Sequence, residues 1–197
     1  MLANLKLIRW IAFPSKEYYH GGLLDATTVN DQDLALQKTL VEYFGRLGAA
    51  WVSRRFRMGI DISGPDVKSE AYQGSASLFN QTEANFTVNL IQNWLEYQPR
   101  DPGARQITPG DIKVVTPYTG QLRAIRSALM RLPSGSGAHQ VAQNIFTTKK
   151  VQGKEGHLVI YSHVRNVPGN PTDFGFTKDK KMLNVSLTRA KTFLMGK

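Results

Sequence analysis

Arg189 lies in a stretch of the chain whose residue types suit phosphate binding. Residues 184–191 have the sequence NVSLTRAK, which places Arg189 and Lys191 two positions apart. On the short helix that this stretch predicts, the two cations point to different sides, so Arg189 can reach into a cleft while Lys191 faces elsewhere. A guanidinium binds phosphate oxygens at two points and remains charged, which suits a γ-phosphate. A helix that simply carries surface cations is the structural alternative.

A second polar stretch, residues 151–155, precedes the most strongly apolar run of the chain. Gly153 allows a ligand to approach the backbone closely. The side chains of Gln152 and Glu155 can bond a ribose or a phosphate-bound water. An ordinary polar turn between two elements contains the same residue types, so both interpretations stand at this point.

Thr116, Pro117 and Tyr118 follow a short apolar run and precede a basic helical segment. A hydroxyl, a rigid turn and an aromatic ring at the end of a strand suit contacts to a nucleic-acid backbone and base. A Pro-Tyr turn can also be purely structural.

Several other chemistries are excluded by the sequence. Cysteine is absent, and the four histidines lack the spacing of metal ligands, so no metal site is predicted. The G-x-x-x-x-G-K-[ST] pattern is also absent, so the chain has no Walker A loop with which to cradle a triphosphate by itself. The apolar start is short and is interrupted by Lys6 and Arg9, unlike a signal peptide or a membrane span. We therefore expect an intracellular protein, cytoplasmic or nuclear, without a membrane partner.

Strand-like and helix-like segments alternate along the chain. Helices are predicted at 33–44, from an Asn80 cap to about Tyr97, at 122–132 and at 184–191; extended segments are predicted at 51–63, 112–115, 141–146, 157–164 and 192–195. Such alternation predicts an α/β fold with a mainly parallel sheet and helices on both faces. The length of 197 residues fits a single domain.

Positive charge is concentrated in the second half of the chain. Residues 1–99 contain 9 Lys and Arg against 10 Asp and Glu, whereas residues 100–197 contain 16 against 5, a net charge of +11. This asymmetry indicates a surface for a polyanion, although a basic surface without a partner has the same composition.

Taken in order, these stretches resemble the C-terminal RecA-like domain of superfamily 1 helicases, in particular the up-frameshift-like group. VVTPYTGQ at 114–121 resembles motif IV, residues 147–165 resemble motif V, and LNVSLTRAK at 183–191 resembles motif VI. Residues 13–26 and 74–84 resemble two further stretches of that domain. The resemblance implies a RecA-like P-loop NTPase-type domain that spans nearly the whole chain but lacks its own Walker A loop.

The resemblance also implies roles for individual residues. Arg189 would be the arginine that meets the γ-phosphate. Gln152, Gly153 and Glu155 would line the ribose side of the nucleotide, with Arg165 at or beside the same cleft. The nucleic-acid side would include Thr116, Pro117, Tyr118, Thr147 and Lys150. ATP and Mg²⁺ would bind only together with a first RecA-like domain, in cis or in trans, and single-stranded RNA or DNA would be the other partner.

Two departures from the family pattern keep alternatives open. Relatives begin this domain with a Gln-Tyr-Arg-Met segment, where this chain has LKLIRW at 5–10. They also have an acid and a serine where this chain has Lys149 and Lys150. The first hypothesis is a motor domain that supplies the arginine finger; the second is a degenerate remnant that binds nucleic acid or protein without catalysis. An unrelated α/β enzyme is the third.

Overall fold

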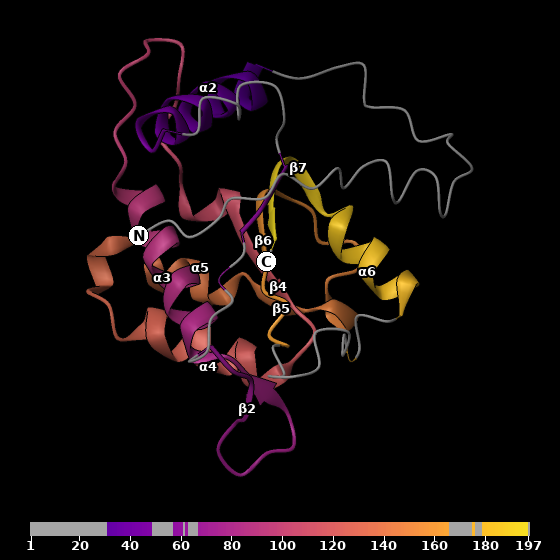
Figure 1. The fold of residues 1–197 in the computed structure, drawn as a ribbon. Helices are drawn as coiled ribbons and strands as arrows, with labels where there is room; N and C mark the ends of the chain where they lie inside the picture. Colours follow the sequence, from indigo (N-terminus) through magenta and orange to yellow (C-terminus); the bar gives the residue numbers. More distant parts are fainter. Residues whose placement is uncertain are drawn as a thin grey trace.

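The computed structural model describes residues 31–48, 57–60, 62, 67–165, 175 and 179–196. Its main sheet has five strands in the order β1-β7-β6-β4-β5, and all neighbouring pairs are parallel (Figure 1). The strands are β1 (Arg57–Gly59), β4 (Ile112–Thr116), β5 (Ile145–Thr147), β6 (Gly156–Tyr161) and β7 (Ala190–Gly196). A two-stranded hairpin, β2 (Glu70–Ala71) with β3 (Leu78–Phe79), lies apart from this sheet.

Helices cover both faces of the main sheet (Figure 1). They are α2 (Asp31–Arg46), α3 (Gln81–Glu96), α4 (Thr119–Met130), α5 (Ala138–Gln143) and α6 (Lys180–Leu187). Helices α2 to α5 pack on the larger apolar core, which includes Leu158 and Phe193. Helix α6 packs on the other face, where Val159 and Leu194 form a smaller core. The α/β fold with a mainly parallel sheet is confirmed, and the architecture is consistent with a RecA-like domain.

The larger core is built from the apolar faces of the helices. Leu36 and Leu40 recur at helical spacing on α2 and are fully buried, as is Trp94 of α3. The Trp94 ring meets Phe193 of β7 edge to face, at 6.2 Å between centroids. Together with the contact between Phe44 and Phe193, this packing holds α2 and α3 against β7.

Helix α3 begins where the sequence predicts. The side chain of Asn80 accepts a 3.1 Å hydrogen bond from the backbone N–H of Glu83, as an N-cap should. Strand β4 and helix α4 also lie at the predicted places. Within α4, Arg126 donates to the carbonyls of Ala142 and Ile145, so this cation joins α4 to α5 and β5.

Two predicted elements in the last third of the chain are only partly correct. The segment 141–146 was expected to be a strand, but α5 ends at Gln143 and β5 begins at Ile145. Ala138, Val141 and Ala142 share one buried helical face, and this i, i+3, i+4 pattern outweighs the β propensity of Val141. The last helix covers Lys180–Leu187 rather than 184–191, because Asp179 caps it by accepting from the N–H groups of Lys181 and Met182.

Some predictions concern residues outside the described ones. These are the departure from the family pattern at 5–10, the similarity at 13–26, and residues 51–56, 61 and 63 of the extended segment 51–63. The description of residues 1–197 as a single domain also stays a prediction.

Candidate functional site

The candidate residues divide between the two edges of the parallel sheet. Thr116 and Thr147 end β4 and β5 in register with each other, and Arg165 follows β6, so these three lie toward the carboxyl edge. The turn 152–155 precedes β6, and Arg189 precedes β7, so these residues lie at the amino edge. The six residues of β6 separate the edges by about 20 Å. The structure therefore does not bring Arg165 to Arg189, although both were expected at the nucleotide.

At the carboxyl edge, two of the residues predicted to meet nucleic acid are buried. Thr116 is fully buried and Tyr118 is 4% exposed, while Pro117 between them is partly exposed. A Cβ placed on Gly175 would lie 2.5 Å from Tyr118 Oη and 2.6 Å from Arg165 Cδ. The backbone at Gly175 thus packs directly against both side chains. The role of Thr116 and Tyr118 in nucleic-acid binding stays a prediction.

A buried polar network lies beside these residues. The Ser162 hydroxyl donates to Glu83 Oε2 at 2.7 Å, and the Val164 N–H donates to the same oxygen at 3.0 Å. Gln121 links the start of α4 to this group, because its Nε2 donates to Ser162 Oγ and its Oε1 accepts from the N–H of Asn80. Each of these five residues is at most 2% exposed. The network holds the segment after β6 against the first turns of α3 and α4.

Val164 has an unusual backbone within this network. Its φ of 75° lies in the left-handed region, which costs a β-branched residue energy. The carboxylate of Glu83 accepts from its N–H, and Asn80 Nδ2 donates to its carbonyl at 3.4 Å. The network therefore stabilises a strained conformation one residue before Arg165 and fixes where Arg165 leaves the sheet.

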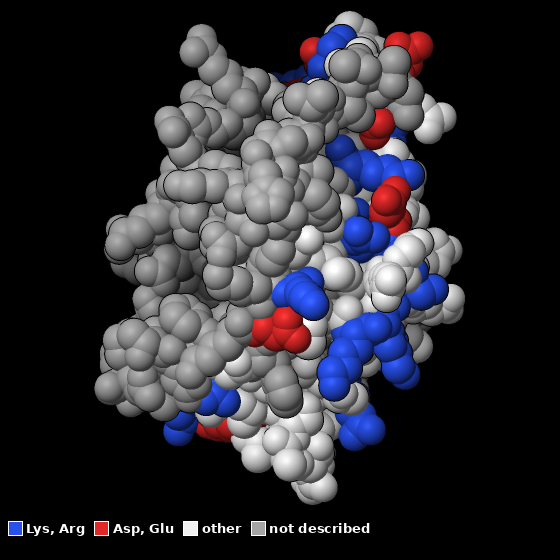
Figure 2. Space-filling view, turned by 90° about the vertical axis from the view of Figure 1, so that its right-hand side faces the viewer, with Lys and Arg blue, Asp and Glu red and all other residues white. Residues whose placement is uncertain are grey.

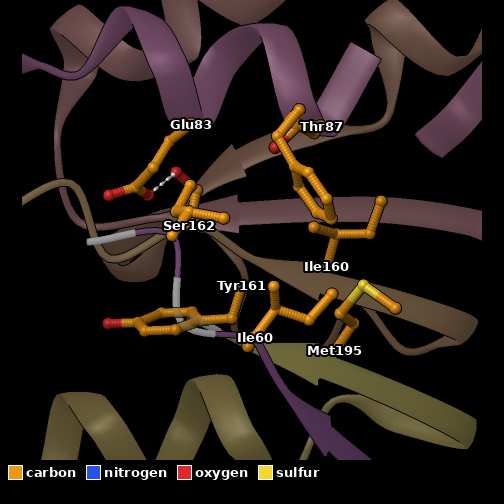
Figure 3. Close-up of a pocket in the computed structure, with 10 residues that line it drawn as sticks. Ile60, Glu83, Thr87, Ile160, Tyr161, Ser162 and Met195 are labelled. Carbon is orange, nitrogen blue, oxygen red and sulfur yellow. Dashed lines mark hydrogen bonds between the residues drawn. The ribbon is translucent and has the colours of Figure 1, made fainter. Parts of the chain in front are cut away.

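Glu83 is a site residue that the sequence analysis missed. It lies in the first turn of α3, where an acidic residue is also favoured by the positive end of the helix. Figure 3 shows its side chain directed from α3 toward Ser162 at the end of β6. Both residues border a small, mainly apolar hollow between α3 and the ends of the strands, lined also by Ile60, Thr87, Ile160 and Met195 (Figure 3). The sequence carries no local signal for this role, because the buried partners Gln121 and Ser162 lie far along the chain from Glu83.

At the amino edge, the turn before β6 is open. Gln152, Gly153 and Glu155 are exposed, and Gly153 has a φ of 73° with no atom within 4 Å of an ideal Cβ. Lys191 lies close to this turn, with its Nζ 3.6 Å from Glu155 Oε2. The segment from Thr148 to Glu155 connects the carboxyl end of β5 to the amino end of β6, and Thr147 and Lys150 lie on it or at its start.

Arg189 is held in place by the end of α6. Its Nε donates to the Val185 carbonyl at 2.8 Å, and its Nη2 donates to Thr188 Oγ1 at 3.0 Å. A cation at a helix C-terminus is stabilised by the unpaired carbonyls there. Because α6 ends at Leu187, Arg189 does not lie on a helix, and the expected division of Arg189 and Lys191 between two helix sides is wrong. The guanidinium is partly exposed and has further N–H groups for an anion.

Arg189 and the open turn are neighbours. The backbone N–H of Gly156 donates to the Arg189 carbonyl at 3.1 Å, and Gly156 pairs with Ala190 at the start of the two strands. Further along, Leu158 pairs with Phe193, so β7 has one more residue than β6 over this interval. Such a bulge changes the direction of side chains at the edge of a sheet. The structure thus brings Glu155, Arg189 and Lys191 together.

The described residues show few features of other sites. None of their helices is long and apolar enough to cross a membrane. No group of three or more His, Asp or Glu among them is placed to hold a metal ion. Figure 2 shows the side on which α6 lies, where Lys and Arg side chains outnumber the acidic ones over the described surface.

The sequence as a whole was compared with known proteins. A family model for an AAA domain matches residues 8–195. The chain belongs to this AAA domain family. Among curated relatives, the AAA domain is 31% identical over 136 residues to the putative helicase mov-10-B.1 of Danio rerio, covering 65% of this chain and 13% of that protein.

Two further relatives agree with this assignment. The AAA domain is 30% identical over 128 residues to the ATP-dependent helicase upf1 of Schizosaccharomyces pombe, covering 63% of this chain and 12% of upf1. It is 26% identical over 183 residues to the helicase sen1 of the same organism, covering 93% of this chain and 9% of sen1. The chain is therefore a helicase-related domain similar to the up-frameshift-like group, and it spans only a small part of each relative's length.

Proposed function

We propose that this AAA domain is the second RecA-like domain of an ATP-dependent RNA or DNA helicase and that Arg189 is its arginine finger. The main support is the position of Arg189, which is fixed by Val185 and Thr188 beside the open turn 152–155. An arginine in a cleft between two domains stabilises the charge that develops on a transferred phosphoryl group. The names of mov-10-B.1, upf1 and sen1 support the helicase assignment.

The residues present fit a nucleotide as substrate. The free N–H groups of Arg189 suit the γ-phosphate, and the Glu155 carboxylate, at the exposed turn, suits a ribose hydroxyl. Gly153 leaves the backbone open to a ligand. Since the chain has no Walker A loop, a first RecA-like domain would hold the remaining phosphates and Mg²⁺.

Nucleic acid would bind toward the opposite edge of the sheet. Pro117, Thr147 and Lys150 are at least partly exposed and are the accessible members of the predicted group. Thr116 and Tyr118 are buried in this structure and would contact the strand only after they become exposed. Closure of the two domains around ATP would bring Arg189 onto the γ-phosphate, and reopening after hydrolysis would move the strand.

The experiment is ATP hydrolysis by this chain mixed with, or fused to, a first RecA-like domain of the same protein group. The chain alone should show no turnover. In the two-domain system, the variant Arg189→Ala should lower kcat by about 10³-fold or more. Equal turnover by Arg189→Ala and the unaltered protein would contradict the proposal.

A non-enzymatic remnant is the second candidate, and the two departures from the family pattern, LKLIRW at 5–10 and the pair Lys149 and Lys150, favour it. If no first domain supports hydrolysis while the chain still binds single-stranded nucleic acid, this second function is the better one. Such binding should weaken steeply with salt, because it depends on Lys and Arg contacts to phosphates.

A further inference from the structure

A cluster of lysines lies at the amino edge on the face that carries α6. Lys113 of β4, Lys154 of the turn before β6 and Lys191 of β7 come from three different elements. Burial lowers the pKa of Lys113, and the nearby charges of Lys154 and Lys191 lower it further. No role in the function proposed above requires Lys113 or Lys154.

Gly156 makes the position of Lys113 possible. An ideal Cβ on Gly156 would lie 2.8 Å from Lys113 Cγ and 2.9 Å from its Cδ. The stem of Lys113 therefore lies across the start of β6, where any other residue would displace it. This packing holds a half-buried ammonium group at the edge of the sheet.

The cluster has little compensating negative charge. Lys113 Nζ and Lys154 Nζ lie 5.8 Å and 5.1 Å from the centre of the Phe146 ring, on which both make cation–π contacts. Glu155 pairs with Lys191. In the part of the chain that the structure describes, neither Lys113 nor Lys154 forms an ion pair.

Such an arrangement favours an anionic ligand. A partly buried ammonium group beside two like charges is destabilised, and a bound anion would offset both the repulsion and the loss of hydration. The cluster also lies at the amino edge of the sheet, as Arg189 does. The length of β6 separates this edge by about 20 Å from the carboxyl edge, where nucleic acid is expected.

We propose that Lys113, Lys154 and Lys191 form a binding site for a polyphosphate group. Three positive charges from three separate elements suit a polyphosphate better than a single phosphate. The site rests on the proposed function in that the polyphosphate would belong to the nucleotide that Arg189 meets, whose phosphates these lysines would share with the first RecA-like domain. Unlike the expectation drawn from the family resemblance, this proposal lets the chain bind ATP weakly without that first domain. Free inorganic triphosphate has the same chemistry and is the direct probe of the site.

The test is isothermal titration of the 197-residue chain with inorganic triphosphate, with ATP and with adenosine at low salt. Triphosphate and ATP should bind, and adenosine should not. Lys113→Gln and Lys154→Gln should each weaken triphosphate binding about tenfold, the loss of one charge-assisted contact. Lys68→Gln is the matched control, because Lys68 is exposed and pairs with Glu70 elsewhere on the surface. It should change the affinity less than twofold.

The outcomes separate this inference from the proposed function. Equal affinity for ATP and triphosphate would show that the polyphosphate group alone is sufficient for binding. Tighter binding of ATP would show that the rest of the nucleotide also contributes. Both results support the site. Absence of triphosphate binding, or equal losses in Lys154→Gln and Lys68→Gln, would overturn it even if hydrolysis in the two-domain system depends on Arg189. Conversely, triphosphate binding that depends on Lys113 and Lys154, without any Arg189-dependent hydrolysis, would contradict only the motor function.

Loss of binding to a single-stranded oligonucleotide in Lys113→Gln, without triphosphate binding by the unaltered chain, would also overturn the proposal. That result would assign the lysines to nucleic acid instead. Circular dichroism of each variant identifies any that fail to fold, and the exposed Lys154 gives a variant whose folding should be unchanged.

Discussion

The carbonyl of Arg189 accepts a 3.1 Å hydrogen bond from the N–H of Gly156, the residue that follows Glu155. This backbone contact joins the two stretches that the sequence analysis selected for nucleotide chemistry, although Gly156 and Arg189 lie 33 positions apart. It exists because β6 and β7 are parallel neighbours, so that the segments before each strand meet at one edge. The candidate site is therefore a consequence of sheet order.

The network around Glu83 should contribute strongly to stability. Glu83→Ala leaves the buried Ser162 hydroxyl and the Val164 N–H without their acceptor, so we expect a loss of about 2–4 kcal/mol in the free energy of unfolding. Urea unfolding measures the loss. Glu96→Ala, at the exposed end of the same helix, should change stability by less than about 0.5 kcal/mol. Similar losses in the two variants would show that Glu83 does not hold the segment after β6.

Gly120 and Gly45 should respond in opposite ways to the same substitution. A Cβ on Gly120 would lie 2.6 Å from the Leu78 carbonyl oxygen and 2.8 Å from that of Ser77, so Gly120→Ala should destabilise the chain by about 1–3 kcal/mol. Gly45 lies in α2, and an ideal Cβ on it would meet no atom within 4 Å apart from its chain neighbours and the helix's own backbone. Gly45→Ala should therefore stabilise the chain by about 0.5–1 kcal/mol. Thermal unfolding of both variants measures this. A neutral Gly120→Ala would contradict the close packing of α4 on the β3 hairpin.

Asp111 should make stability depend on acid pH. Burial of its carboxyl raises the pKa, but the bidentate Arg105 guanidinium and two hydrogen bonds from Thr108 outweigh this, so the pKa lies below its usual range. The stability from ionised Asp111 is therefore present above the ordinary carboxyl pKa of about 4 and is lost as pH falls through the lower, folded-state pKa.

The matching variant is Asp111→Asn. It should lose about 2–3 kcal/mol of unfolding free energy at pH 7, and its difference from the unaltered chain should shrink as the pH falls below the ordinary carboxyl pKa of about 4. Glu70→Gln, which breaks an exposed pair with Lys68, should cost less than about 1 kcal/mol at either pH. Urea titrations at several pH values give both curves; a constant difference for Asp111→Asn would contradict the lowered pKa.

The sequence predicted those parts of the fold whose signals are local. Asn80 caps α3, and the apolar runs at β4 and β6 form strands, because capping and propensity act over a few residues. The last helix was misplaced because Lys191 and Arg189 were counted within it, whereas the Asp179 cap fixes its start and the strand pairing of Ala190 prevents its extension.

The candidate site could be predicted only in part for the same reason. Motif-like stretches identified Arg189 and Glu155 singly, but their contact depends on the order of the strands. Glu83 and Ser162 are 79 positions apart, and Lys113 and Gly156 lie on the neighbouring strands β4 and β6. Neither contact therefore has a pattern within one stretch of the sequence. The separation of Arg165 from Arg189 follows from the length and direction of β6, which a motif list does not contain.

The most direct test of the central claim is ATP hydrolysis in the two-domain system with Arg189→Ala and Arg189→Lys. Lysine keeps a positive charge but lacks the planar fork, so the account predicts that it restores only a small part of the activity that alanine removes. Arg131→Ala, at the exposed C-cap of α4, is the control and should leave turnover unchanged. A loss of about 10³-fold in kcat for Arg189→Ala, with triphosphate binding retained, is the predicted result. Turnover by Arg189→Ala equal to that of Arg131→Ala would contradict it.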